Sequence, residues 1–155
     1  KNRIWIGTFE GNVIIENGVT KLLNDKNSPL SKAYISKIYE DKKGFFWFDL
    51  YNDKSNEAGI YVLDLQGKWT KISHPNPKMF SENAINDFYL DEESNLLWIT
   101  LNGVGVLCYD TNSKKWETYT NENSNVPSVH CERITKDKDG SIWIATYAGV
   151  IKLNQ

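Results

Sequence analysis

The chain has 155 residues and a mass of 17.9 kDa, which is the size of one ordinary domain. Apolar residues make up 40% and charged residues 25%, so the composition indicates a globular chain rather than a disordered one. The formal net charge is -2 without blocks of like charge, which argues against a nucleic-acid partner. No run approaches the roughly 18 apolar residues of a membrane span, and Lys1 to Thr8 lacks the apolar core of a signal peptide, so we expect no membrane contact from this segment.

Tryptophan recurs at intervals of about 45 residues, each time inside a short apolar run. The run is IWIGTF in the first repeat and IWIATY in the last. The four tryptophans are Trp5, Trp47, Trp98 and Trp143. In the last three repeats a turn with a leading aspartate precedes the tryptophan, and an alternating segment precedes the turn. All these segments are short, rich in β-branched and aromatic residues and bounded by Gly, Asn, Asp or Ser, which predicts strands.

Each complete repeat predicts a four-stranded antiparallel meander, which is the size of a propeller blade. The first repeat begins at its second strand and the last ends after its third, so the pattern predicts about 14 strands. The expected fold class is all-β, a β-propeller segment of two complete blades plus two three-stranded partial blades. We expect a single propeller fragment or half-propeller over 1-155, made of a partial blade 3-23, blades 34-73 and 83-120, and a partial blade 130-154. Loops at 24–34, 74–83 and 121–129 would join successive blades.

A closed propeller usually needs at least about four blades, which this length does not supply. The two partial blades lack different strands, so they do not combine into one complete blade. We therefore expect either the remainder of a longer propeller or self-association with a second copy, because an open blade would expose a large apolar face.

The last repeat carries the pattern DKDGSIWIATYAGV, from Asp137 to Val150, and the first opens with RIWIGTFEGNVII. With KKWETYT and NENSNVPS elsewhere, this pattern resembles the two-component regulator propeller repeat over essentially the whole chain. The second repeat departs from it at Phe48–Leu50 and by an insertion at Tyr51–Ala58. The resemblance implies a periplasmic or extracellular sensor region of a bacterial hybrid two-component histidine kinase. It also implies binding of oligosaccharides or similar nutrients, with a signal passed through a membrane helix to a cytoplasmic kinase.

Catalysis has little support in the sequence, and we expect no enzyme activity, no cofactor and no metal. The two histidines are His74 and His130, and the sequence shows no nucleophile elbow, P-loop or dinucleotide fingerprint. Cys131 follows His130, but neighbours on a strand point to opposite faces and cannot simply form a dyad. The repeated aspartates before the tryptophans are expected to cap their turns rather than to bind a metal.

The tryptophans are expected to pack between blades rather than to serve as sugar platforms, although an aromatic platform is an open alternative. Cys108 and Cys131 could meet across a blade interface, but we expect two free buried thiols. The most plausible ligand site is the propeller face formed by the loops that follow the second and fourth strands, since function concentrates in loops. Aromatic, amide and polar groups suited to a sugar occur there, and the candidate ligand-binding residues are Phe9, Tyr51, Asn52, Asn102, His130 and Tyr147.

The leading hypothesis is an extracytoplasmic ligand-sensing propeller segment of a two-component sensor, recognising a carbohydrate or other small nutrient. One alternative is a propeller scaffold for protein–protein interaction or dimerisation. A second alternative is a propeller lyase or hydrolase, which would need a histidine and a carboxylate that converge over the channel.

Overall fold

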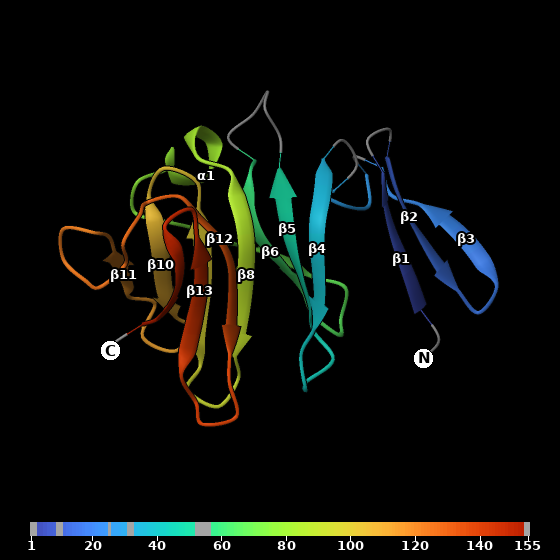
Figure 1. The fold of residues 1–155 in the computed structure, drawn as a ribbon. Coiled ribbons are helices and arrows are strands. Elements are labelled where there is room, and N and C mark those ends of the chain that lie inside the picture. Colours follow the sequence, from blue (N-terminus) through green and yellow to red (C-terminus); the bar gives the residue numbers. More distant parts are fainter. Residues whose placement is uncertain (1–2, 9–10, 25, 31–32, 52–56, 154–155) are drawn as a thin grey trace. The chain divides into compact units, whose positions relative to one another are not determined.

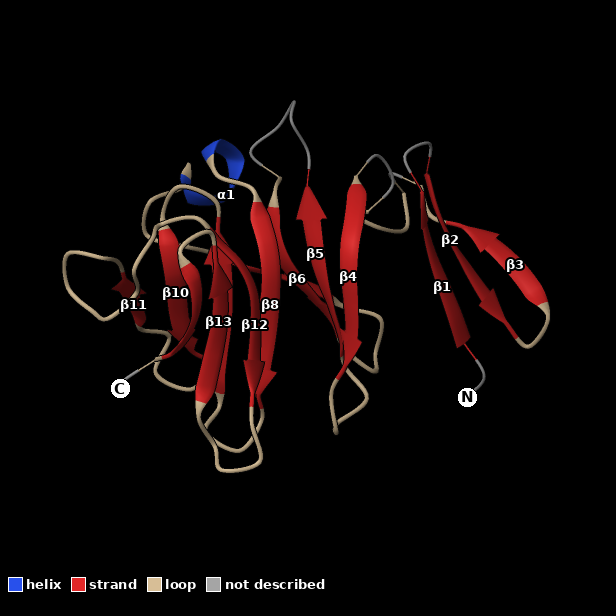
Figure 2. Cartoon of the chain, in the orientation of Figure 1, coloured by secondary structure: helices blue, strands red, loops and turns tan. Residues whose placement is uncertain are grey.

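The computed structural model describes residues 3–8, 11–24, 26–30, 33–51 and 57–153. The chain divides into two compact units, Lys1–Ser81 and Glu82–Gln155. The described residues form fourteen strands and one four-residue helix, and the strands make four antiparallel sheets, two in each unit. Figure 1 follows the elements along the chain, and Figure 2 shows how little of the chain is helical. The all-β propeller class expected from the repeats is confirmed.

The first unit contains a three-stranded sheet and a four-stranded sheet. Consecutive strands pair as antiparallel neighbours, so each sheet is a simple meander. The three-stranded sheet consists of β1 (Arg3–Thr8), β2 (Gly11–Glu16) and β3 (Val19–Leu22). The four-stranded sheet consists of β4 (Tyr34–Glu40), β5 (Phe46–Tyr51), β6 (Gly59–Leu63) and β7 (Trp69–Ile72), and the helix α1 (Met79–Glu82) follows it.

The second unit repeats this plan in the opposite order, with the complete meander first. Its four-stranded sheet consists of β8 (Ile85–Asp91), β9 (Leu96–Leu101), β10 (Gly105–Asp110) and β11 (Trp116–Tyr119). Its three-stranded sheet consists of β12 (Cys131–Lys136), β13 (Ile142–Thr146) and β14 (Gly149–Lys152). The strands that the sequence assigned to partial and complete blades therefore occur where they were expected. The prediction that the whole chain forms one propeller fragment remains a prediction.

An aspartate organises the turn before each of two tryptophans. Oδ1 of Asp41 accepts the backbone N–H groups of Lys43 and Phe45, both at 2.9 Å, and Oδ2 accepts Nε1–H of Trp47 at 2.9 Å. Asp137 makes the same three bonds in the last sheet, with Trp143 Nε1 at 2.7 Å. The bond from Trp143 contributes most to lowering the pKa of Asp137. The turn-capping interpretation of these aspartates is confirmed.

The third repeat departs from this arrangement because its turn is one residue longer. Asp91 accepts Ser94 Oγ–H at 2.6 Å and Lys136 Nζ–H at 2.9 Å rather than an indole. Nε1 of Trp98 is consequently buried without a hydrogen-bond partner. Lys136 belongs to β12, so Asp91 joins the two sheets of the second unit, while it still accepts Ser94 Oγ–H and the N–H of Glu93 in its own turn.

Trp5 and Trp98 pack between the two sheets of their units, as expected. In the first unit, Trp5 of β1 lies 4.8 Å from the ring of Phe48 and 5.2 Å from that of Phe46, both on β5. In the second unit, Trp98 belongs to the buried cluster that also contains Ile142 and Ile144 of β13. Each such tryptophan therefore closes the interface with the sheet that follows it in its own unit.

Both cysteines are free and buried, as the sequence predicted. They lie in the same apolar cluster of the second unit. Burial raises the pKa of the Cys108 thiol to about 12 and that of Cys131 to about 11, with nearby carboxylates adding to the effect. Both groups are therefore protonated thiols near neutral pH.

The connections between sheets share one hydrogen-bonded turn. Asn27 accepts the N–H of Asn24 at 2.8 Å and donates to Leu22 O at 3.2 Å. Asn123 makes the matching bonds to Thr120 and Thr118, both at 2.8 Å. A buried aliphatic residue follows each turn and enters the core, Leu30 in the first unit and Val126 in the second.

The helix α1 was not expected, because its four residues fall within a segment predicted as a loop. Within the described part of the chain, no helix is long and apolar enough to cross a membrane.

Candidate functional site

The end of the tryptophan-bearing strand occupies an equivalent position in each sheet. In each case the residue lies four positions after the tryptophan. It is Tyr51, the last residue of β5, Asn102 directly after β9, and Tyr147 directly after β13. Phe9 holds this position in the first repeat, but Phe9 and Asn52 lie outside the described residues. Tyr51 belongs to the first unit, whereas Asn102, His130 and Tyr147 belong to the second. The second unit thus brings together three of the six predicted site residues.

Backbone contacts bring Asn102, His130 and Tyr147 together. Asn102, just beyond β9, forms an antiparallel bridge with His130, just before β12. The N–H of Tyr147 donates to the carbonyl of His130 at 3.1 Å, which fixes the β13–β14 turn beside the same residue. One residue from each of three strand ends therefore meets at this edge of the unit.

The side chains of the three residues are in contact as well. Nδ1 of His130 lies 2.7 Å from Oδ1 of Asn102. The rings of His130 and Tyr147 stack with their centroids 5.3 Å apart and their planes inclined by 26°. We call this group the Asn102–His130–Tyr147 cluster.

The contact with Asn102 indicates which imidazole nitrogen donates. An amide oxygen only accepts, so with Oδ1 of Asn102 facing the ring, Nδ1 of His130 is the donor. In the neutral ring Nε2 is then a hydrogen-bond acceptor, and it becomes a donor when the ring is protonated. The Asn102 side-chain amide adds two N–H donors. The cluster therefore offers both donors and an acceptor at its surface.

Tyr147 supplies the largest exposed apolar surface of the cluster. Its side chain is 74% exposed even though its ring stacks on His130. A flat aromatic face that is held in place by a second ring is suited to the apolar face of a sugar or another small ring, and neighbouring polar groups can fix its orientation. The arrangement can bind a small polar ring.

Asn86 and Arg133 hold the strand ends beneath the cluster, and the sequence analysis did not single them out. Nδ2 of Asn86 donates to Cys131 O at 2.9 Å, and Arg133 Nη1 donates to Asn86 O at 3.0 Å. These bonds join β8 to β12. A bulge occurs at the corresponding position of β4, β8 and β12, where the strand register shifts by one residue. A break in the apolar–polar alternation at this point is the signal that could have identified Asn86.

The first unit carries aromatic residues at the equivalent strand ends. Tyr34 at the start of β4 pairs with Tyr51 at the end of β5, and both side chains are exposed. The pair of Tyr34 and Tyr51 in the first unit therefore corresponds to the pair of His130 and Asn102 in the second unit.

The remaining candidates for chemistry lie apart from the cluster. His74 accepts the N–H of Asn76 through Nδ1 at 3.0 Å and contacts the edge of the Phe80 ring in the first unit. Cys131 is fully buried whereas His130 is exposed, so the two side chains point apart as expected for neighbours on a strand. Among residues 3–8, 11–24, 26–30, 33–51 and 57–153, no three His, Cys, Asp or Glu side chains are grouped so as to hold a metal ion.

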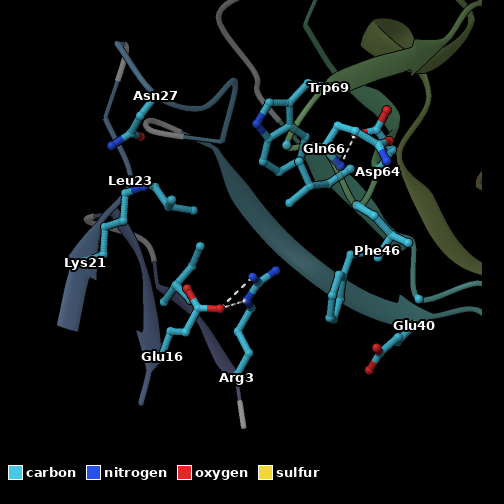
Figure 3. A pocket seen from close by; sticks show the side chains of 15 residues that line it. Arg3, Glu16, Lys21, Leu23, Asn27, Glu40, Phe46, Asp64, Gln66 and Trp69 are labelled. Atoms are coloured by element: carbon cyan, nitrogen blue, oxygen red, sulfur yellow. Dashed lines mark hydrogen bonds and ion pairs between the residues drawn. The ribbon is translucent and has the colours of Figure 1, made fainter. Parts of the chain in front are cut away.

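A groove lies in the first unit, at the opposite strand ends from Tyr34 and Tyr51. This groove has a volume of about 500 Å³ and lies between the two sheets of the unit. Figure 3 shows Arg3, Glu16 and Lys21 on the side of β1–β3, and Phe46 and Trp69 on the side of β4–β7. Nothing in the repeat pattern predicts this groove.

Comparison with protein families identifies one repeat directly. Residues 124–148 match the family described as the two component regulator propeller. This segment contains Trp143 and much of the pattern on which the resemblance was based, and the resemblance is confirmed there. No protein of curated function matches the chain significantly.

Solved structures of bacterial proteins share the fold over the whole chain. An extracellular domain assigned to the hybrid two component system BT3049 of B. thetaiotaomicron matches with a TM-score of 0.75 and 25% identity, covering 100% of this chain and 20% of that one. An extracellular domain assigned to the system BT4673 of the same species matches with a TM-score of 0.73 and 21% identity, covering 98% of this chain and 22% of that one.

PorZ, a surface component of the type-IX secretion system of Porphyromonas gingivalis, matches with a TM-score of 0.66 and 18% identity, covering 95% of this chain and 23% of that one. The BT4673 and PorZ similarities concern the fold alone. The chain spans about a fifth of the length of each of these relatives.

Proposed function

We propose that this chain is a segment of the extracytoplasmic sensing propeller of a two-component regulator. Three observations support the proposal: the regulator-propeller repeat at 124–148, the blade-like meanders of both units, and the similarity to the extracellular domain of BT3049. Since the chain spans about a fifth of that relative, we further propose that it works as part of a longer propeller. Its location would be periplasmic or extracellular, like that of the relatives.

The proposed role of the segment is recognition of a carbohydrate or a similar polar nutrient by the Asn102–His130–Tyr147 cluster. The observation that carries this proposal is the exposed Tyr147 ring stacked on His130, whose Nδ1 is fixed 2.7 Å from Asn102 Oδ1. The stacked ring would support the apolar face of a sugar. The Asn102 amide and His130 Nε2 would bind its hydroxyl groups.

We propose binding rather than catalysis at this cluster. Its members offer hydrogen bonds and an aromatic face, while the adjacent thiol of Cys131 is buried and protonated. Binding would be transmitted through the bonds that tie the strand ends of β8 and β12 together, which Asn86 and Arg133 provide.

The proposal is tested by applying the purified chain to an array of oligosaccharides and measuring affinities for the sugars retained. Asn102→Ala and His130→Ala should each weaken binding by about tenfold, because each removes a hydrogen-bonding group worth roughly 1.4 kcal/mol. Val19→Ala, at an exposed position in the first unit, is the control and should bind like the native chain. Sugar binding that survives both site substitutions unchanged would place recognition elsewhere.

A further inference from the structure

The groove of the first unit contains polar groups that the fold itself does not use. Nε1–H of Trp69 is accessible, and neither it nor the ammonium group of Lys21 has a hydrogen-bond or ion-pair partner in the described part of the chain. The two groups come from β7 and β3, which are strands of different sheets. Two free donors, one of them a cation, thus line the groove between the two sheets.

The other polar groups of the groove are largely occupied within the protein. Arg3 donates to Glu16 through Nη2 at 2.7 Å and Nε at 3.3 Å, so its charge is neutralised by a neighbour. Its guanidinium group also lies 5.7 Å from the centre of the Phe46 ring. Oδ1 of Asp64 accepts the N–H groups of Gln66 and Lys68 in its own turn. The unpaired positive charge is therefore that of Lys21.

The groove has the volume of a small-molecule site, and aromatic residues form part of its wall. Phe46 and Trp69 are aromatic and half-buried, and Leu23 and Leu63 are buried beside them. Trp69 also contacts Phe48 at 5.2 Å between ring centroids, which holds the indole in position. A volume of about 500 Å³ lies within the range of roughly 300–1,000 Å³ that small-molecule sites occupy.

The corresponding groove of the second unit differs at the decisive positions. In the first unit, the strand register places Arg3 opposite Glu16 and Ile14 opposite Lys21. At the equivalent positions of the second unit, Leu96 lies opposite Asp110 and Cys108 lies opposite Glu117. Leu96 thus replaces Arg3, and Glu117 replaces Lys21. Glu117 already accepts the hydroxyl of Tyr119 at 2.7 Å, and this second groove is smaller, at about 370 Å³. The repeat itself therefore does not require a cationic groove, and Lys21 distinguishes the groove of the first unit from that of the second.

We propose that the groove between β1–β3 and β4–β7 is a second binding site, for a small carboxylate that carries a ring. The ring would lie against Phe46 and Trp69, and the carboxylate would accept hydrogen bonds from Lys21 and Trp69 Nε1. Glu16, Glu40 and Asp64 also line the groove, so a single negative charge is accommodated better than a multiply charged anion. This inference is independent of the proposed sugar recognition, which takes place in the other unit.

The test is a nuclear magnetic resonance titration of the whole chain, with the indole N–H signal of Trp69 as the reporter. Trp69→Phe assigns the signal. The probes are sodium benzoate for an aromatic acid, sodium glucuronate for a sugar acid, and glucose as the uncharged control. One or both carboxylates should shift the signal to saturation, and glucose should not. A response to benzoate alone would assign the groove to aromatic acids, and a response to glucuronate alone would assign it to sugar acids.

Two matched lysine variants complete the experiment. Lys21→Met should weaken the apparent affinity by about tenfold or more, since it removes a charged hydrogen-bond donor to the carboxylate. Lys115→Met removes the lysine of the second groove and should leave the affinity unchanged. His130→Ala should also leave it unchanged, which separates this result from the test of sugar recognition. A signal that no carboxylate shifts, an equal response to glucose, or full affinity in Lys21→Met would each overturn the proposal.

Discussion

Asp41 shows how one side chain can fix both a turn and a neighbouring core residue. Its carboxylate accepts two backbone N–H groups and the indole N–H of buried Trp47. Asp41→Ala leaves all three donors without this acceptor, and a buried donor without a partner is costly. We expect the free energy of unfolding to fall by about 2–3 kcal/mol. Urea unfolding followed by tryptophan fluorescence measures the loss.

Asp64 provides a matched control for this substitution. It caps a turn of the same kind, through Gln66 N–H at 2.9 Å and Lys68 N–H at 2.8 Å, but it binds no tryptophan. Asp64→Ala should therefore cost less, about 1 kcal/mol. Equal losses for the two variants would mean that the bond to Trp47 contributes nothing.

The ion pair of Asp91 and Lys136 predicts a pH dependence of stability. Burial of Asp91 acts to raise its pKa, but hydrogen bonds from Ser94 and Lys136 outweigh it and hold the pKa below the ordinary value of 3.8. The contribution of Asp91 is therefore complete above pH 3.8 and is lost as the pH falls through its lower folded-state pKa. Asp91, followed by Glu93, raises the pKa of Lys136 above 10.5, so that contribution is lost only in strong alkali.

Lys136→Met tests this pH dependence. The native chain should have a higher melting temperature than the variant at pH 6, and the difference should shrink toward pH 2 as Asp91 is protonated. Thermal unfolding followed by circular dichroism at several pH values gives the comparison. A difference that is the same at pH 2 and pH 6 would show that the pair does not stabilise the fold.

At the scale of the strand, Gly105 lies where no side chain fits. Its φ of +112° is in a region that other residues rarely adopt, and an added Cβ would lie 2.5 Å from the carbonyl oxygen of Tyr119. Gly105→Ala should therefore destabilise the fold by about 3 kcal/mol or more. Gly149 begins the equivalent strand with a φ of +116°, but an added Cβ would meet nothing within 4 Å. Gly149→Ala should cost only about 1 kcal/mol of backbone strain, and chemical denaturation compares the two.

The periodic elements could be predicted from the sequence because strands and turns depend on local patterns. The alternation around Trp5, Trp47, Trp98 and Trp143 marks the strands, and the aspartate before the tryptophan marks the turn. The replacement of the tryptophan indole by Lys136 as a hydrogen-bond donor to Asp91 could not be predicted in the same way. One extra turn residue leaves Trp98 Nε1 without a partner, and the lysine that replaces it as a donor is 45 residues away in the chain.

The candidate site was predictable in part for a similar reason. Asn102 and Tyr147 could be selected because the repeat places them at equivalent strand ends, and His130 because it opens the first strand of its repeat. Their mutual contacts depend on the bridge between two sheets, which no local pattern records. The groove of the first unit could not be predicted from the sequence, because only the packing of two sheets brings Arg3, Lys21 and Trp69 together.

At the scale of the whole molecule, the outer face of the first sheet predicts self-association. Ile4, Ile6 and Leu22 are exposed, and their cross-strand partners Ile15 and Val13 share that face. Light scattering should show a mass that rises above 17.9 kDa with concentration, because apolar faces of this kind associate. Replacing Ile4, Ile6 and Leu22 by threonine should suppress the rise. A native chain that stays at 17.9 kDa at every concentration would show that the exposed face does not drive association.

The central claim is that the Asn102–His130–Tyr147 cluster recognises a carbohydrate through the stacked ring of Tyr147. The most direct measurement is calorimetric titration of an array-selected oligosaccharide into the native chain, Tyr147→Phe and Tyr147→Ala. Tyr147→Phe keeps the aromatic face and should retain affinity within a few-fold. Tyr147→Ala removes the face and should weaken binding by about tenfold or more. Equal affinities for the alanine variant and the native chain would contradict the claim.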